Sequence, residues 1–204
     1  MSADGQPSWM IHEDSSIPVL LALWLRETLH IASPTDLPRL RGVPVGDTPD
    51  RDVDEQDRLE RQWREWWAMT VEPEAHPSAV PLELIDEYGT WVALPTSGAD
   101  DLAAAIRPLH VAATSWVEWA RSGYTKASSG RPSDSYRAYA GTIAEHEREV
   151  GRRAHSFELN VEVLPLAERG VWWIGSLTVA VTDSLRTDAA AFDAAIHPII
   201  AEIA

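Results

Sequence analysis

HSFELNVEVLPLAERGVWWIGSLTVAVT, residues 155–182, is the stretch that decides the fold predicted for this chain. Apolar and polar side chains alternate through its first half, and successive side chains of a strand point to opposite faces. Glu168, Arg169 and Gly170 interrupt the pattern, and glycine readily adopts the backbone conformation of a tight turn. The sequence therefore predicts a long antiparallel hairpin that occupies residues 155–182.

Helical patterns of apolar residues precede and follow this hairpin. They predict helices over residues 16–31, 50–69, 78–88, 99–122 and 135–153, and a last helix that Thr187 caps. The segment TWVAL, residues 90–94, predicts a third strand at the edge of the hairpin. The predicted fold is α+β, with about five or six helices packed on a small antiparallel sheet and closed by the C-terminal helix.

The length of 204 residues is typical of a single domain, and we expect residues 1–204 to form one. Residues 1–15 are polar and are expected to be loose. Residues 32–49 contain four prolines and two glycines, which prevent regular structure. Because Leu37 and Leu40 recur through this segment, we expect it to lie on the core as an irregular arm.

Composition excludes several classes of partner. The net charge of −15 repels phosphate groups, so we expect no nucleic acid and no anionic membrane as a partner. The chain has no cysteine, no apolar run of about 20 residues and no secretory signal at its start. These features predict a cytoplasmic protein.

Ten tryptophans are an unusual number for this length. Trp63, Trp66 and Trp67 fall on one helical stripe, and Trp116 and Trp119 fall on another. Exposed indoles can stack on ligands or anchor a partner protein, whereas buried ones fill a core. Helical spacing favours the core for most of them.

The segment from Arg121 to Arg153 has seven basic residues and four acidic ones, against the acidic balance of the whole chain. It includes YTKASSGRPSD, residues 124–134, which is predicted to be a loop. A small anionic ligand would meet its basic side chains there. The candidate ligand-binding residues are Lys126, Arg131 and Arg137. The spacing of a P-loop is absent, and a plain surface loop is the favoured interpretation.

The helix predicted over residues 135–153 contains candidates for acid/base chemistry or metal binding. These candidates are Glu145, His146 and Glu149, with His155 just beyond the helix. His146 and Glu149 are three residues apart and can share a metal ion, but Val150 stands where a zinc protease motif needs its second histidine. A solvated helix face with Glu–Arg pairs is favoured instead, and we expect no bound metal or cofactor.

Asp50, Asp52 and Asp54 match the opening of a calcium-binding loop. The match then fails, because Glu55 stands where the loop needs glycine and Arg61 where it needs glutamate. We interpret the three aspartates as acids that favour the start of a helix.

The last part of the chain, which includes TDAAAFDAAIHPIIAEIA, resembles the ends of small uncharacterised proteins of high-GC bacteria, and this resemblance implies no activity. No catalytic motif is present. The sequence therefore predicts an interaction or accessory protein without catalytic activity, which binds a protein partner through a Trp-containing groove or a sheet edge. The alternatives are a binder of a small anionic molecule through residues 121–153 and an enzyme that uses the Glu/His cluster. The sequence leaves the oligomeric state open.

Overall fold

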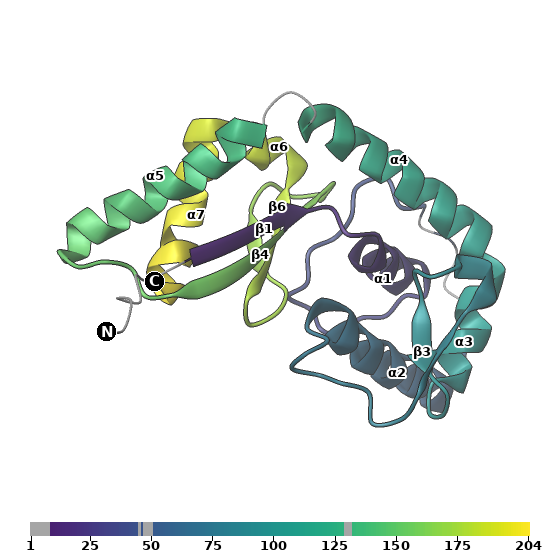
Figure 1. Ribbon diagram of the computed structural model, residues 1–204. Coiled ribbons are helices and arrows are strands. Elements are labelled where there is room, and N and C mark those ends of the chain that lie inside the picture. Colours follow the sequence, from purple (N-terminus) through teal and green to yellow (C-terminus); the bar gives the residue numbers. More distant parts are fainter. Residues whose placement is uncertain (1–8, 45, 47–50, 129–131) are drawn as a thin grey trace.

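The computed structural model describes residues 9–44, 46, 51–128 and 132–204, and it confirms an α+β fold (Figure 1). In chain order, the elements are β1 (Trp9–Asp14), α1 (Ile17–Thr28), α2 (Val53–Val71), β2 (Leu82–Leu84), η1 (Asp86–Tyr88), β3 (Ala93–Pro95), α3 (Asp100–Ile106), η2 (Arg107–Leu109), α4 (His110–Ser128), α5 (Pro132–Val150), β4 (Phe157–Leu164), β5 (Val171–Trp173), β6 (Thr178–Thr182), α6 (Asp183–Arg186) and α7 (Ala189–Ile203).

The main sheet is mixed, so the predicted antiparallel hairpin is wrong. Its strand order is β1-β4-β6-β5; β1 and β6 both run parallel to β4, and β5 runs antiparallel to β6. The stretch 155–182 forms three strands because the chain bends between Trp173 and Thr178. Gly175 lies so close to α2 that a Cβ would come within 2.8 Å of the Glu72 side chain, which also accepts a hydrogen bond from the Ser176 backbone at 2.6 Å.

Two further predictions also need correction. Residues 9–14, expected to be loose, form β1, which pairs in register with Phe157–Glu162 of β4. The expected edge strand at 90–94 does not join the main sheet. Its place is taken by β3, which pairs with β2 in a separate two-stranded sheet. Residues 82–84 are therefore a strand within the range that was predicted as a helix.

The ends of three helices differ from the prediction. Helix α4 continues through Gly123, a residue that an exposed helix tolerates at a cost of about 1 kcal/mol, so residues 124–128 are helical. Helix α5 begins at Pro132 and ends at Val150. The last helix is capped by Asp188 and not by Thr187, because the Asp188 carboxylate accepts the Ala191 backbone N–H.

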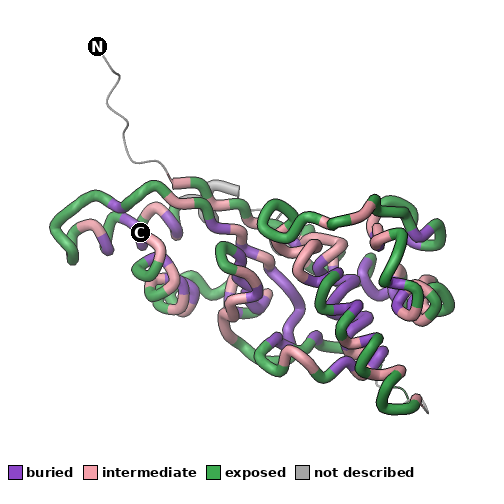
Figure 2. Tube along the Cα trace, turned by 90° about the horizontal axis from the view of Figure 1, so that it is seen from below, coloured by how far each residue is buried: buried purple, intermediate pink, exposed green. Residues whose placement is uncertain are grey.

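The sheet separates two hydrophobic cores, and buried segments occur in both halves of the molecule (Figure 2). One face of β4 and β6 packs on α7 and α5, which lie together on one side of the sheet (Figure 1). The last helix therefore covers the dry face of the sheet, as the apolar stripe from Phe192 predicts. The residues at this interface are Tyr139, Ile143, Leu159, Val161, Val179, Val181, Phe192, Ile196 and Ile200.

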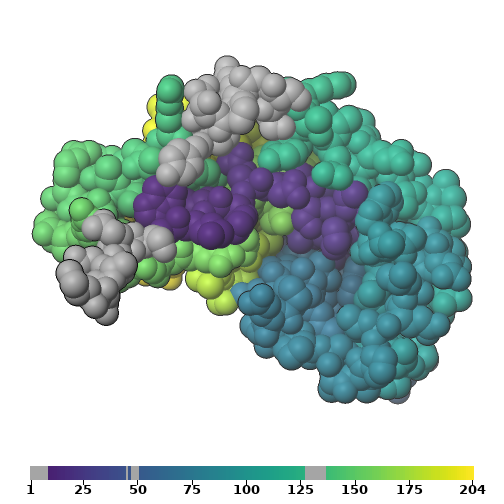
Figure 3. All heavy atoms as spheres, viewed as in Figure 1, coloured from purple at the N-terminus to yellow at the C-terminus, as the bar shows by residue number. Residues whose placement is uncertain are grey.

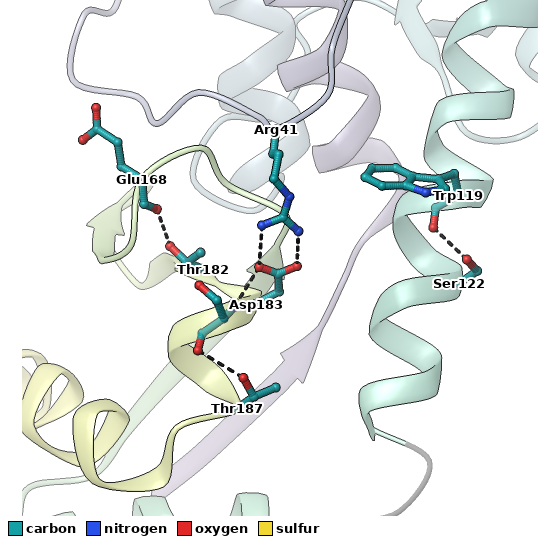
Figure 4. Close-up of polar contacts among 8 residues, drawn as sticks. Arg41, Trp119, Ser122, Glu168, Thr182, Asp183 and Thr187 are labelled. Atoms are coloured by element: carbon teal, nitrogen blue, oxygen red, sulfur yellow. Dashed lines mark hydrogen bonds and ion pairs between the residues drawn. The ribbon is translucent and has the colours of Figure 1, made fainter.

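The second core belongs to α1, α2, α3 and α4, and it receives Leu164 and Ala180 from the opposite face of the sheet. Leu37 and Leu40 of the irregular segment are buried in this core. Leu40 pairs with Leu166, and the Arg41 backbone N–H donates to the Pro165 carbonyl at 2.7 Å. Arg41 also forms an ion pair of 2.7 Å with Asp183 at the start of α6 (Figure 4).

The tryptophan stripe of α2 is core, as helical spacing predicts. Trp63 is 0% exposed; its ring stacks on Trp67 with centroids 5.4 Å apart, and its N–H donates to the Ala22 carbonyl. Trp116 is buried too and donates to the Gly42 carbonyl. Trp119 is the exception on the second stripe, because 53% of its surface is exposed.

A partly buried ion cluster joins β1 to the C-terminal half. The Glu13 carboxylate accepts hydrogen bonds from the Tyr139 hydroxyl at 2.6 Å and from Arg186 Nε at 2.7 Å. The Arg186 guanidinium also lies 4.5 Å from the centre of the Phe192 ring. Figure 3 shows the N-terminal segment, in purple, between the green helix α5 and the teal helices.

Glu162 of β4 reaches across to the second core. Its carboxylate accepts the backbone N–H of Ser16, the N-cap of α1, at 2.8 Å. Burial raises the pKa of Glu162 to about 7, and the nearby Asp14 carboxylate adds to the rise. The folded protein therefore holds this carboxyl protonated in a pH range where the unfolded chain has lost the proton.

The tryptophan assignment predicts unequal losses of stability. Trp63→Ala should lower the free energy of unfolding by about 3–5 kcal/mol, because it leaves a cavity in the core. Trp119→Ala, the matched control on the surface, should cost roughly 1 kcal/mol or less. Denaturant titrations measure both, and equal midpoints for the two variants would contradict the assignment.

Glu162 predicts a pH dependence of stability. Between about pH 5 and pH 7 the folded state binds one proton more than the unfolded state, so the free energy of unfolding should fall as pH rises. A pKa shift of this size corresponds to about 3 kcal/mol. Glu162→Gln keeps the acceptor for Ser16 and removes the charge. The variant should match wild type near pH 5 and be more stable near pH 8. An equal difference at both pH values would refute this role.

Candidate functional site

The two described residues of the proposed anion-binding set lie on different helices. Lys126 lies exposed in the last turn of α4, and Arg137 lies exposed on α5. Arg131 falls outside the described residues. The expected loop that was to present them is partly helical, which removes the geometric reason for grouping them.

Of the four candidates for acid/base chemistry or metal binding, two lie together and two do not. Glu145 is exposed on α5, and His155 is exposed beyond it, with its backbone N–H donating to the Ala204 carbonyl oxygen. His146 and Glu149 lie together, and they face His197 of α7. The structure thus replaces His155 with His197 as the second histidine of the cluster.

Core packing positions this cluster. Helix α5 buries Tyr139, Ile143 and His146 on one face, at spacings of four and three residues. Helix α7 buries Ile196, the residue just before His197, against the same core. The two histidines therefore meet at the seam between α5 and α7, where the apolar stripes of the helices are already in contact.

The geometry of the three side chains is compact. One ring nitrogen from each histidine and one Glu149 carboxylate oxygen all lie within 4.8 Å of one another. Glu149 Oε2 lies 3.3 Å from His197 Nε2. His146 is only 6% exposed, whereas the side chain of His197 is 30% exposed and that of Glu149 is 55% exposed. The cluster therefore runs from the core to the surface.

The side chain of His146 has a buried ring nitrogen without a hydrogen-bond partner in the described chain. Its Nε2 is shielded from solvent and has no hydrogen-bond partner within the described chain, and His197 Nε2 also lacks a partner in hydrogen-bond geometry. Leaving a buried polar atom unpaired costs about 1–3 kcal/mol unless water or a ligand pairs with it. A bound ligand would remove that cost.

Two imidazoles and a carboxylate are a ligand set for a divalent transition metal. With zinc bonds of about 2.0–2.1 Å in a tetrahedron, neighbouring ligand atoms lie roughly 3.4 Å apart. The separation of 3.3 Å between Glu149 Oε2 and His197 Nε2 fits that value. His146 offers a ring nitrogen within 4.8 Å of both of these ligand atoms.

Sequence reasoning found two of the three residues and missed His197. It lies 48 positions after Glu149 on another helix, so no local spacing links them. The sequence did contain one indication of His197. It directly follows Ile196, which belongs to the apolar stripe of the last helix, so a position near the core was predictable.

A second candidate, an open cavity of about 510 Å³, lies between the end of α2 and residues 75–80. Small apolar side chains and prolines form most of its wall, and its ionisable residues are Glu65 and His76. His76 lies 3.8 Å from Glu72, with which it forms an ion pair. This cavity offers less specific chemistry than the seam between α5 and α7.

Asp52 has an assigned structural role, in agreement with the sequence interpretation. It is the N-cap of α2, and its carboxylate accepts the Glu55 backbone N–H at 2.7 Å. Asp50 lies outside the described residues.

Within the described chain, no helix is long and apolar enough to span a bilayer.

Comparison with protein-family models, with curated proteins and with solved structures found no match to this chain. The resemblance of its C-terminal part to small proteins of high-GC bacteria stays a prediction. The functional argument therefore depends on the geometry of the His146–Glu149–His197 cluster.

This geometry predicts an unusual response to substitution of His146. His146→Leu removes an unpaired polar atom from the core and keeps a similar volume, so it should leave the metal-free protein as stable as wild type, or raise its free energy of unfolding by about 1 kcal/mol. Denaturant melts in the presence of a chelator measure this. A loss above roughly 2 kcal/mol would show that His146 is a stabilising core residue and not a residue retained for a ligand.

Proposed function

We propose that this protein binds a divalent transition-metal ion, Zn²⁺ first among them, through His146, Glu149 and His197. The observation that supports it most strongly is the buried, unpaired His146 Nε2 next to the Glu149–His197 pair. The proposal develops the alternative in which the Glu/His cluster of α5 carries the chemistry.

A metal ion accounts for the cluster better than an ion pair does. A partly exposed His–Glu pair contributes about 0–1 kcal/mol, and it leaves the His146 nitrogen unsatisfied. A cation bound to all three side chains would satisfy that nitrogen and use the Glu149 charge. Two imidazole ligands favour zinc or another transition metal over Mg²⁺ and Ca²⁺, which prefer oxygen.

Binding at this position would tie α5 to α7. These helices together cover one face of the main sheet, so the ion would fix the layer that closes the C-terminal core. Because the three ligands come together only in the folded state, metal binding would add to the free energy of unfolding. The function proposed is therefore a metal-dependent one, located in the C-terminal half.

One observation favours protein interaction as a second function. Trp119 is half exposed, yet its ring is held against Trp116, with centroids 5.9 Å apart, and against the arm at Gly42. Figure 4 shows Trp119 on α4 on the side of Arg41. A rigid, exposed indole is the kind of residue that anchors a protein partner.

Calorimetry of chelator-treated protein with Zn²⁺ tests the metal proposal. We expect one ion per chain, and a loss of affinity of at least about tenfold in each of His146→Leu, Glu149→Gln and His197→Ala, because each removes one ligand. His155→Ala and Glu145→Gln are the matched controls, since both residues lie outside the cluster. Both controls should bind as wild type does.

Two results would contradict the proposal. One is the absence of saturable Zn²⁺ binding to wild-type protein that is shown to be folded under the conditions of the titration. The other is binding that the three cluster variants retain at full strength, which would place the ion elsewhere on the chain.

A further inference from the structure

The metal ligands identified in the structure do not complete the coordination shell of the proposed ion. Within the described residues the cluster consists of His146, Glu149 and His197 and has no fourth member. Structural zinc sites are closed by four protein ligands, whereas sites that react or exchange ligands have three and hold water or substrate in the remaining position. Two histidines and one carboxylate form a set of this open kind.

The exposed fractions of the ligand residues indicate that the open coordination position of the ion faces solvent on the side of Glu149. His146 forms the buried side of the cluster at 6% exposure, and Glu149 forms its outer side at 55%. An ion bound among the three side chains would lie between the shielded Nε2 atoms of the two histidines and the exposed Glu149 carboxylate, so its solvent side would be the side of Glu149.

Charge determines the class of that ligand. A divalent ion bound to one carboxylate and two neutral imidazoles leaves a local charge of about +1. The protein as a whole carries −15, so anions are repelled except where a local positive centre attracts them. A small anion with a donor oxygen or nitrogen therefore suits the open position better than a neutral or cationic molecule.

We propose that the metal ion held by His146, Glu149 and His197 keeps an exchangeable coordination position that binds a small anionic ligand from solution, of the carboxylate or hydroxamate class. This inference rests on the proposed metal-binding function and adds a ligand class to it. It also gives an anion-binding role to the C-terminal half at a place other than Lys126 and Arg137.

The competing arrangement is a coordination shell closed by a fourth protein ligand. Asp193 is exposed on α7, one turn before His197, so its carboxylate is the nearest candidate on that helix to close the shell. A site closed by Asp193 would bind metal and would have no place for an outside ligand. The variant Asp193→Asn distinguishes the two arrangements.

Cobalt substitution provides the test, because the visible absorption of Co²⁺ reports its ligands directly. Chelator-treated protein is loaded with Co²⁺ and then titrated with azide or acetohydroxamate, with sodium perchlorate, a weakly coordinating anion, at equal ionic strength as the control. We expect a saturable change of the Co²⁺ spectrum with azide and acetohydroxamate, no change with perchlorate, and the same response in Asp193→Asn. His146→Leu should show no protein-bound Co²⁺ spectrum.

The outcomes separate this inference from the function on which it rests. A Co²⁺ spectrum that neither azide nor acetohydroxamate alters would overturn the open position and leave the metal site standing. A response seen only in Asp193→Asn would overturn it too, since Asp193 would then be the fourth ligand. A wild-type protein that binds no Co²⁺ and no Zn²⁺ would overturn the metal site itself.

Discussion

Strand β4 belongs to both hydrophobic cores, and the two halves of the molecule are joined through it. Its apolar face, with Leu159 and Val161, packs under α7, and its last residue, Leu164, enters the core of α1 to α4. On either side it pairs with β1 and β6, so it holds together segments that are far apart in the sequence. Because these pairings are long-range, they gain stability only after a large entropic cost has been met.

The candidate site follows from this arrangement. Helices α5 and α7 pack on each other because each must bury an apolar stripe on the same face of the sheet. That packing brings His146 and Glu149 to His197. Since His146 lies in the stripe where an apolar residue would be expected, the core gives up stability at that position. Such a local conflict with good packing is a typical mark of a functional residue.

Local patterns in the sequence were enough for some parts of the fold and not for others. The alternation of β4, the helical stripe of Trp63 and the apolar stripe of α7 each depend on near neighbours, and all three were predicted. The bend before β6 brings Gly175 against the end of α2, which lies about a hundred residues earlier, and no local pattern indicates this contact. Strand β1 was missed because its six residues carry a weak alternation, and only the pairing with β4 makes them a strand. His197 was missed for the same reason, as a contact between distant helices leaves no local spacing.

The central claim is that three side chains at the seam of α5 and α7 hold one metal ion. The most direct measurement is a crystal structure of the zinc-loaded protein with diffraction recorded at the zinc absorption edge. The account predicts one strong anomalous peak within bonding distance of His146, Glu149 and His197, with bonds of about 2.0–2.2 Å. A peak at another pair, such as His12 of β1 and Glu158 of β4, or no peak in a protein that folds normally, would contradict it.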